Sequence, residues 1–83
     1  MVFRVRLEVA ARSDWLALRS ALHSVGPLVF DDFQGLGLSL EAVSADAAVK
    51  RAQRIVRCAL EGATGLTADD VVYGAQEWPM RSG

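Results

Sequence analysis

Residues 2–10 read VFRVRLEVA and residues 36–43 read LGLSLEAV, and in both stretches apolar residues recur at every second position. Successive side chains of a β-strand point to opposite faces, so each stretch predicts a strand with one apolar and one polar face. Each is followed by a segment with the apolar spacing of an amphipathic helix, over about residues 14–25 and from residue 45 to about residue 62. A strand followed by a helix, written twice, decides the architecture.

Two further strands complete the predicted fold. Residues 28–33 are short and apolar and lead through a Gly-containing turn into the strand at 36–43, and residues 70–78 form the last strand. Ser13 and Ser44 are the predicted N-caps of the two helices. The order βαββαβ predicts an α+β sandwich in which a four-stranded antiparallel sheet, in the order 4-1-3-2, carries both helices on one face.

This arrangement resembles the ferredoxin-like superfold across residues 2–78, and that resemblance implies a fold rather than an activity. The motifs of its families are not met, so no specific family is identified. Residues 10–13, AARS, stand where a heavy-metal carrier has its CxxC motif, and residues 37–41, GLSLE, do not match the aromatic RNP1 pattern of an RNA-recognition domain. Amino-acid-binding domains of the ACT type share the topology, but the glycine usual after their first strand is missing.

Composition limits the class of protein. The chain has 83 residues, of which 52% are hydrophobic, which predicts one domain with an ordered core at residues 2–78 and a tail at 79–83. A formal net charge of -1 gives no general attraction to nucleic acid or to an anionic membrane. One cysteine excludes an internal disulfide, and no apolar run approaches the ~20 residues of a membrane helix, so a cytoplasmic protein is expected. Lys50 is the only lysine among nine basic residues, a bias typical of GC-rich genomes such as those of actinobacteria or their phages.

Acidic pairs mark the two predicted edge strands. Asp31 and Asp32 end the second strand, and Asp69 and Asp70 precede and open the fourth, where charge discourages pairing with other chains. Both pairs are expected at the same end of the sheet but on opposite edges, about 14 Å apart across three strand spacings. That separation is too large for a shared cation, so no metal site is predicted.

The sheet face without helices is the main candidate for function. Charged residues of the first strand should line its middle, and apolar or aromatic residues of the two edge strands should flank them. Either Tyr73 or Trp78 is expected there together with Val72. Such a mixed face predicts contact with a second copy or with another protein. The candidate interface residues are Arg4, Arg6, Glu8, Phe30, Phe33, Val72, Tyr73 and Trp78.

A second candidate surface is a basic ridge on the outer side of the second helix, formed by Lys50, Arg51, Arg54 and Arg57. A solvated helix face explains it best. An acidic protein partner and a nucleic acid are the alternatives, although Glu61 interrupts the ridge and no exposed aromatic residue accompanies it.

The two residues most often reactive in proteins lack chemical partners in the sequence. His23 falls on the polar side of the first helix with no carboxylate, thiol or second His nearby, which predicts an ordinary surface histidine. Cys58 lies at the margin of the apolar stripe of the second helix, which predicts a small buried hydrophobic residue. No catalytic, cofactor-binding or metal-binding residue is predicted.

These observations favour a small non-enzymatic interaction module that self-associates or docks to a partner protein through the open sheet face. The first alternative is a small-molecule-binding or catalytic dimeric α+β domain, with a site around Trp15, Tyr73 and Trp78. The second alternative is nucleic-acid binding through the basic ridge.

Overall fold

The structure is a computed structural model that describes residues 1–25, 28–32, 35–61 and 68–78. Its elements follow the predicted order, with one additional turn of 3-10 helix before the last strand. They are β1 (Val2–Glu8), α1 (Arg12–His23), β2 (Val29–Asp32), β3 (Gly35–Glu41), α2 (Ala45–Leu60), the 3-10 turn (Ala68–Asp70) and β4 (Val72–Trp78).

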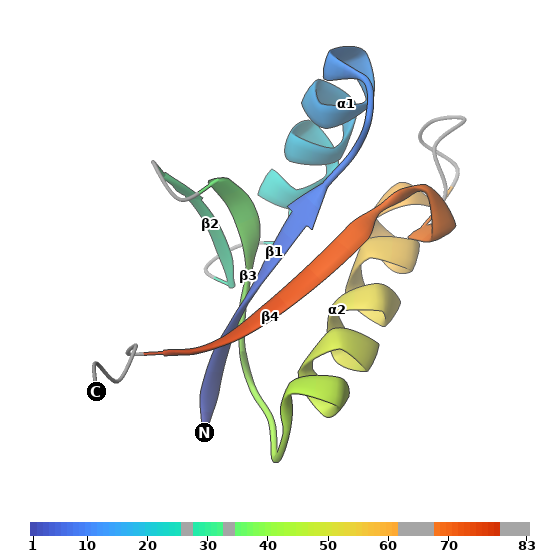
Figure 1. Cartoon of the computed structure of the whole chain (residues 1–83). Helices are drawn as coiled ribbons and strands as arrows, with labels where there is room; N and C mark the ends of the chain where they lie inside the picture. The colour runs from blue at the N-terminus through green and yellow to red at the C-terminus, as the bar shows by residue number, and fades with distance from the viewer. Residues whose placement is uncertain (26–27, 33–34, 62–67, 79–83) are drawn as a thin grey trace.

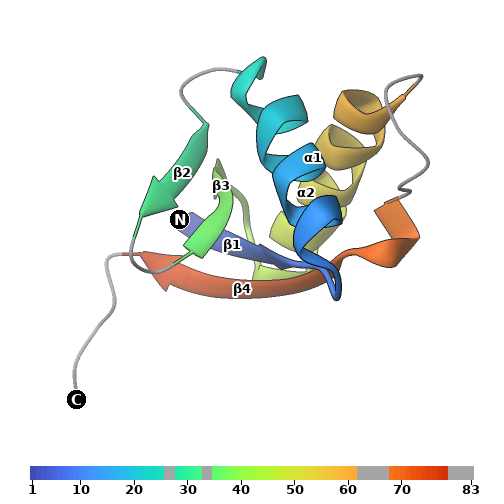
Figure 2. The ribbon, with the colours of Figure 1, turned by 90° about the horizontal axis from the view of Figure 1, so that it is seen from above.

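The four strands form one antiparallel sheet in the order β2-β3-β1-β4, which is the predicted order read from the other edge. β1 lies in the centre, and its Leu7 stands opposite Leu36 of β3 and Tyr73 of β4. Both helices cover the same side of the sheet (Figures 1 and 2). The α+β class and the topology are therefore confirmed, and they are compatible with a ferredoxin-like fold.

The hydrophobic core lies between the sheet and the helices. Val5 of β1 and Leu38 of β3 are fully buried there, as are Leu18 and Leu22 of α1. Helix α2 contributes small residues as well as large ones, and its alanines let its axis approach the sheet closely. The buried residues of the core are Phe3, Val5, Leu7, Leu18, Leu22, Leu36, Leu38, Leu40, Ala48, Ala52, Val56, Leu60 and Val71.

The start of α2 is as predicted, whereas the start of α1 is not. The Ser44 side chain accepts a hydrogen bond from the backbone N–H of Ala47, which confirms it as an N-cap. Helix α1 begins at Arg12, and the backbone N–H of Trp15 donates to the carbonyl of Ala11 at 3.0 Å. Ala11 is therefore the N-cap and Ser13 lies inside the first turn, because the chain enters the helix earlier than the serine suggested.

The two edge strands differ in length and charge. β2 has four residues and ends in Asp31 and Asp32, as predicted. β4 has seven residues and begins at Val72, because Asp69 and Asp70 belong to the 3-10 turn before it. The prediction that these two aspartates protect the edge at β4 is therefore wrong, and β4 carries one charged residue, Glu77.

Among the described residues, no helix has the length and hydropathy needed to cross a membrane. The predicted end of the second helix near residue 62, the residue Phe33 and the tail at 79–83 lie outside the described residues.

Candidate functional site

The candidate site is the open face, which we define as the side of the sheet that faces away from α1 and α2. In the strand register, Arg4 lies between Ser39 and Gln76, and Arg6 lies between Gly37 and Gly74. Because side chains alternate along each strand, residues in register with Arg4 and Arg6 share their face. The open face includes Arg4, Arg6, Glu8, Phe30, Asp32, Gly37, Ser39, Val72, Gly74 and Gln76.

On the β2 side of this face, Phe30 and Asp32 hold the Arg4 side chain in place. Its guanidinium carbon lies 4.1 Å from the centroid of the Phe30 ring, and its Nη2 lies 3.0 Å from Oδ2 of Asp32. The Arg4 side chain is 17% exposed, so the cation is largely shielded from water. A cation stacked on a ring and paired with a carboxylate has little remaining rotational freedom.

Gly37 makes this arrangement possible. A Cβ atom at residue 37 would lie 2.2 Å from the carbonyl oxygen of Val5 and 2.5 Å from Cζ of Phe30. Those distances are far below van der Waals contact, so the Phe30 ring occupies the space that any other residue at position 37 would need. Glycine inside a strand signals such a close approach, although the sequence alone did not identify the ring that causes it.

The β4 side of the open face carries few large side chains near Gly74 and is accessible to solvent. A Cβ atom at Gly74 would have no neighbouring atom within 4 Å, and the Val72 residue is 65% exposed. Arg6 pairs with Glu8 at 3.0 Å, and both side chains are 58% exposed. A pair this exposed contributes little to stability, so both charges remain accessible to a partner.

Tyr73 and Trp78 of β4 were expected as alternatives on this face, and the structure decides against Tyr73. Tyr73 lies on the helix side, packed against the core, which excludes the alternative that placed it on the open face. Burial raises the pKa of Tyr73 above its usual value of 10.0, and the positive charge of Arg57 opposes that shift. Trp78 stands opposite Val2 in the register, and the predicted interface residue Phe33 lies outside the described residues.

His23 has a partner that the sequence did not reveal. Its Nε2 lies 3.6 Å from Oδ2 of Asp31 in β2, and Nε of Arg19 donates a hydrogen bond to the same oxygen. The hydrogen bond from Arg19 is the main cause that lowers the pKa of Asp31 below 3.8, and His23 adds to it. This cluster connects α1 to the edge strand β2. The sequence does not reveal it, because its residues belong to different elements that come together only in the fold.

One of the four cations of the basic ridge on α2, Arg51, makes a hydrogen bond to the neighbouring strand. Arg51 donates from Nη1 to the backbone carbonyl of Glu41 at 2.5 Å, which holds its side chain against the end of β3. Lys50, Arg54 and Arg57 are exposed on α2. All four cations of the ridge are exposed, and the hydrogen bond to Glu41 holds Arg51 in place among them.

Cys58 is exposed, so the prediction of a small buried residue is wrong. The apolar stripe of α2 passes through Val56 and Leu60, and Cys58 lies outside it. In the described part of the chain, no group of three or more His, Cys, Asp or Glu side chains is placed to hold a metal ion.

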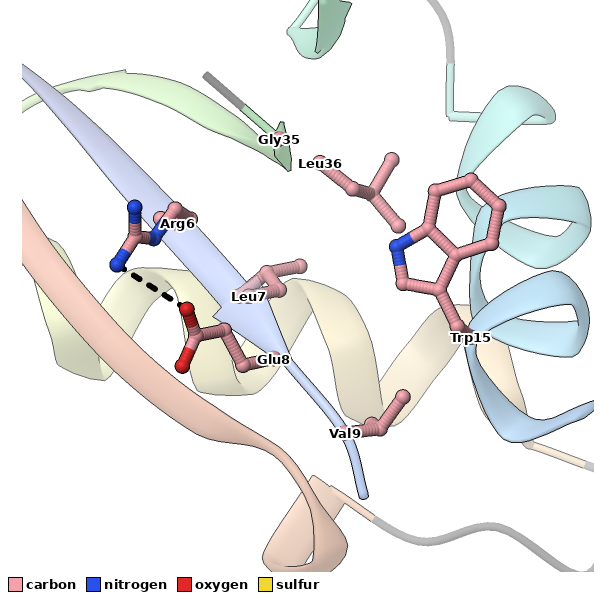
Figure 3. A pocket seen from close by; sticks show the side chains of 7 residues that line it. All are labelled: Arg6, Leu7, Glu8, Val9, Trp15, Gly35 and Leu36. Atoms are coloured by element: carbon pink, nitrogen blue, oxygen red, sulfur yellow. Dashed lines mark ion pairs between the residues drawn. The ribbon is translucent and has the colours of Figure 1, made fainter. Parts of the chain in front are cut away.

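Among the described residues, two open pockets lie at opposite ends of the sheet. The first has a volume of about 410 Å³ and contains the Arg6–Glu8 pair on one side of β1 and Trp15, from α1, on the other (Figure 3). The second has a volume of about 660 Å³ and lies where β3 leads into α2. It is lined by Met1, Glu41, Ala42, Val43, Ala47 and Arg51.

Comparisons with known proteins give no match to a protein family, to a curated protein or to a solved structure. The geometry of the open face and its edges is therefore the basis on which a function can be inferred.

Proposed function

We propose that this protein is a small non-enzymatic interaction module that binds another protein surface through the open face. The observation that carries the proposal is the row in which Arg6 stands between Gly37 and Gly74. Gly74 has no side chain and has open space beside it, so a flat partner surface can reach the Arg6 guanidinium and the backbone of β4 there, whereas the Phe30 ring covers Gly37.

The β2 side of the open face supports this function because the Arg4 side chain is held in one position before a partner binds. Arg4 is already fixed by Phe30 and Asp32, so binding there costs little side-chain entropy. Arginine and aromatic residues also contribute strongly to the energy of protein interfaces.

The β4 side supplies the exposed contacts. Val72 offers apolar area, while Arg6 and Glu8 offer one charge of each sign. A partner surface with an acidic group opposite Arg6 and an apolar group opposite Val72 would match both.

Site-specific photocrosslinking tests the proposal. In a Cys58→Ser background, a benzophenone group attached at Ser39→Cys lies on the open face, and one attached at Lys50→Cys lies on the outer side of α2. We expect adducts with one protein from the Ser39→Cys site, in a larger yield than from the Lys50→Cys control. Excess unlabelled protein should suppress these adducts, and an unlabelled Arg6→Glu variant should suppress them less. Equal yields from the two sites would contradict the proposal.

The pocket beside Trp15 favours a second candidate function, the binding of a small molecule. Its lining combines an indole ring with a charged pair, as in sites that bind polar ligands with an apolar part. A thermal-shift screen of metabolites tests it, because a ligand that binds only the folded state raises the melting temperature by mass action. A Trp15→Ala variant should lose the shift produced by any hit.

A further inference from the structure

We propose that the pocket where β3 leads into α2 binds a small carboxylic acid with an apolar chain, and that Arg51 holds its carboxylate. The inference goes beyond the proposed function, because this pocket lies at the other end of the sheet from the pocket beside Trp15 and needs no protein on the open face. Each proposal can fail without the other.

The start of β1, the end of β3 and the first turns of α2 build this pocket, and Figure 1 shows the N-terminus and the connection from β3 to α2 at the same end of the molecule. The pocket has a volume of about 660 Å³, which is in the range of small-molecule sites. The backbone N–H of Ala42 donates to the carbonyl of Met1 at 2.9 Å, and the Ser44 side chain accepts from the N–H of Ala47. These bonds fix the walls, so the pocket exists before a ligand binds.

The lining of the pocket is mainly apolar. Met1 is 59% exposed and Val43 is 89% exposed, and Ala42 and Ala47 add apolar area with short side chains. An apolar chain lying against these residues would remove their surface from water, at about 25 cal/mol for each Å² buried. The pocket therefore favours a ligand with an apolar part.

Arg51 gives the pocket a positive charge in a fixed position. Its Nη1 donates to the backbone carbonyl of Glu41 at 2.5 Å, which holds the guanidinium at the pocket. Across the described residues, no carboxylate lies within ion-pair distance of Arg51. Its other N–H groups lie in one plane, and the two oxygens of a carboxylate match that planar arrangement. Arg51 thus selects an anion, and a carboxylate fits it best.

The acidic residues near the pocket leave this charge uncompensated. Glu41 stands opposite Val2 in the register, so its side chain alternates onto the open face, and Glu41 holds Arg51 through its backbone carbonyl. Asp46 lies in the first turn of α2 but does not line the pocket. A neutral ligand would bury part of the Arg51 surface without a counter-charge, whereas a carboxylate supplies one.

An NMR titration of the unmodified chain with sodium hexanoate tests the proposal, with 1-hexanol and sodium acetate as matched probes. Hexanol keeps the apolar chain without the charge, and acetate keeps the charge without the chain. We expect hexanoate to shift the backbone amides of Ala42, Val43 and Ala47 saturably, with a dissociation constant at least about tenfold lower than that of either matched probe. Equal affinities for hexanoate and hexanol, shifts centred on Trp15, or no saturable shift would overturn the proposal.

Substitutions in α2 test the assigned residues. Arg51→Gln should weaken hexanoate binding at least about tenfold and leave hexanol binding unchanged. The matched control is Arg54→Gln, one turn further along α2 and outside the lining, which should leave both unchanged. Ala47→Leu places a larger side chain in the pocket and keeps a good helix former, so it should abolish the binding of both. Circular dichroism establishes that each variant is folded. Equal weakening by Arg51→Gln and Arg54→Gln, or unchanged binding by Ala47→Leu, would overturn the proposal.

Discussion

The Arg4 guanidinium lies over the ring of Phe30, with 4.1 Å between the guanidinium carbon and the ring centroid. Arg4 belongs to the central strand β1 and Phe30 to the edge strand β2, so the contact crosses β3 between them. It can cross because residue 37 of β3 has no side chain. The stack therefore depends on Gly37, a residue that takes no part in the stack itself.

Replacing that glycine should damage the fold. We expect Gly37→Ala to lower the free energy of unfolding by about 2–3 kcal/mol, because its Cβ would overlap the Val5 carbonyl and the Phe30 ring. Urea unfolding followed by circular dichroism measures the change. The matched control is Gly74→Ala, whose Cβ meets open space and which should stay within about 0.5 kcal/mol of the unmodified chain. Similar losses from both variants would contradict this account.

Alanine substitutions of Ser13 and Ser44, the two predicted N-caps, should differ in their effect on stability. Ser44→Ala removes a side-chain oxygen that accepts from the Ala47 N–H, and it should cost about 1 kcal/mol of stability. Ser13→Ala removes no capping bond and should cost less than about 0.5 kcal/mol. Parallel urea titrations of the two variants distinguish these outcomes, and a larger loss for Ser13→Ala would place the start of α1 elsewhere.

Asp31 should make the fold sensitive to acid. Its pKa in the folded state lies below the ordinary value of 3.8, mainly because Arg19 donates a hydrogen bond to it. The unfolded chain therefore binds the proton more readily, and the stabilisation is complete above that ordinary value and is lost as the pH falls below it. An NMR titration of the Asp31 carboxyl should give a midpoint below 3.8, and Arg19→Gln should move it upward. A midpoint unchanged by Arg19→Gln would show that the pairing does not form in solution.

The Cys58 thiol should react in the folded protein. Because Cys58 is exposed, a thiol reagent such as DTNB should modify it at a rate within about tenfold of that in denaturant. A buried thiol would react only as fast as the protein opens. Leu60→Cys in a Cys58→Ser background provides that buried reference on the same helix, and equal rates at the two positions would contradict the assigned helix face.

Periodicity was sufficient to predict the order of elements, the topology and most of the core. Strand alternation in residues 3–9 and the helical spacing of Ala48, Ala52 and Val56 each have a direct geometric meaning. The start of α1 was missed because Ser13 matches the preferred cap chemistry while the backbone enters the helix at Ala11. The burial of Cys58 was predicted wrongly, because a residue at the margin of an apolar helix stripe can be either buried or exposed.

The open face was predicted as a region, but its contacts were not. The pairing of Arg4 with Asp32, and that of His23 with Asp31, join residues of different helices and strands, so no periodic pattern within one element contains them. The face on which Tyr73 lies became clear only from its register with Leu7. The aspartates before β4 were read as part of a strand, because a single 3-10 turn has no periodicity to detect.

The central position of β1 has a consequence for how the chain reaches its native state. Leu7 finds its partner Leu36 after a modest loop, whereas its partner Tyr73 closes a loop more than twice as long. The longer closure costs about 0.6 kcal/mol more in chain entropy for each doubling of length, so we expect β1 and β3 to associate before β4 joins them. On the same ground we expect β4 to be the last strand to join the sheet during folding and the first to detach from it.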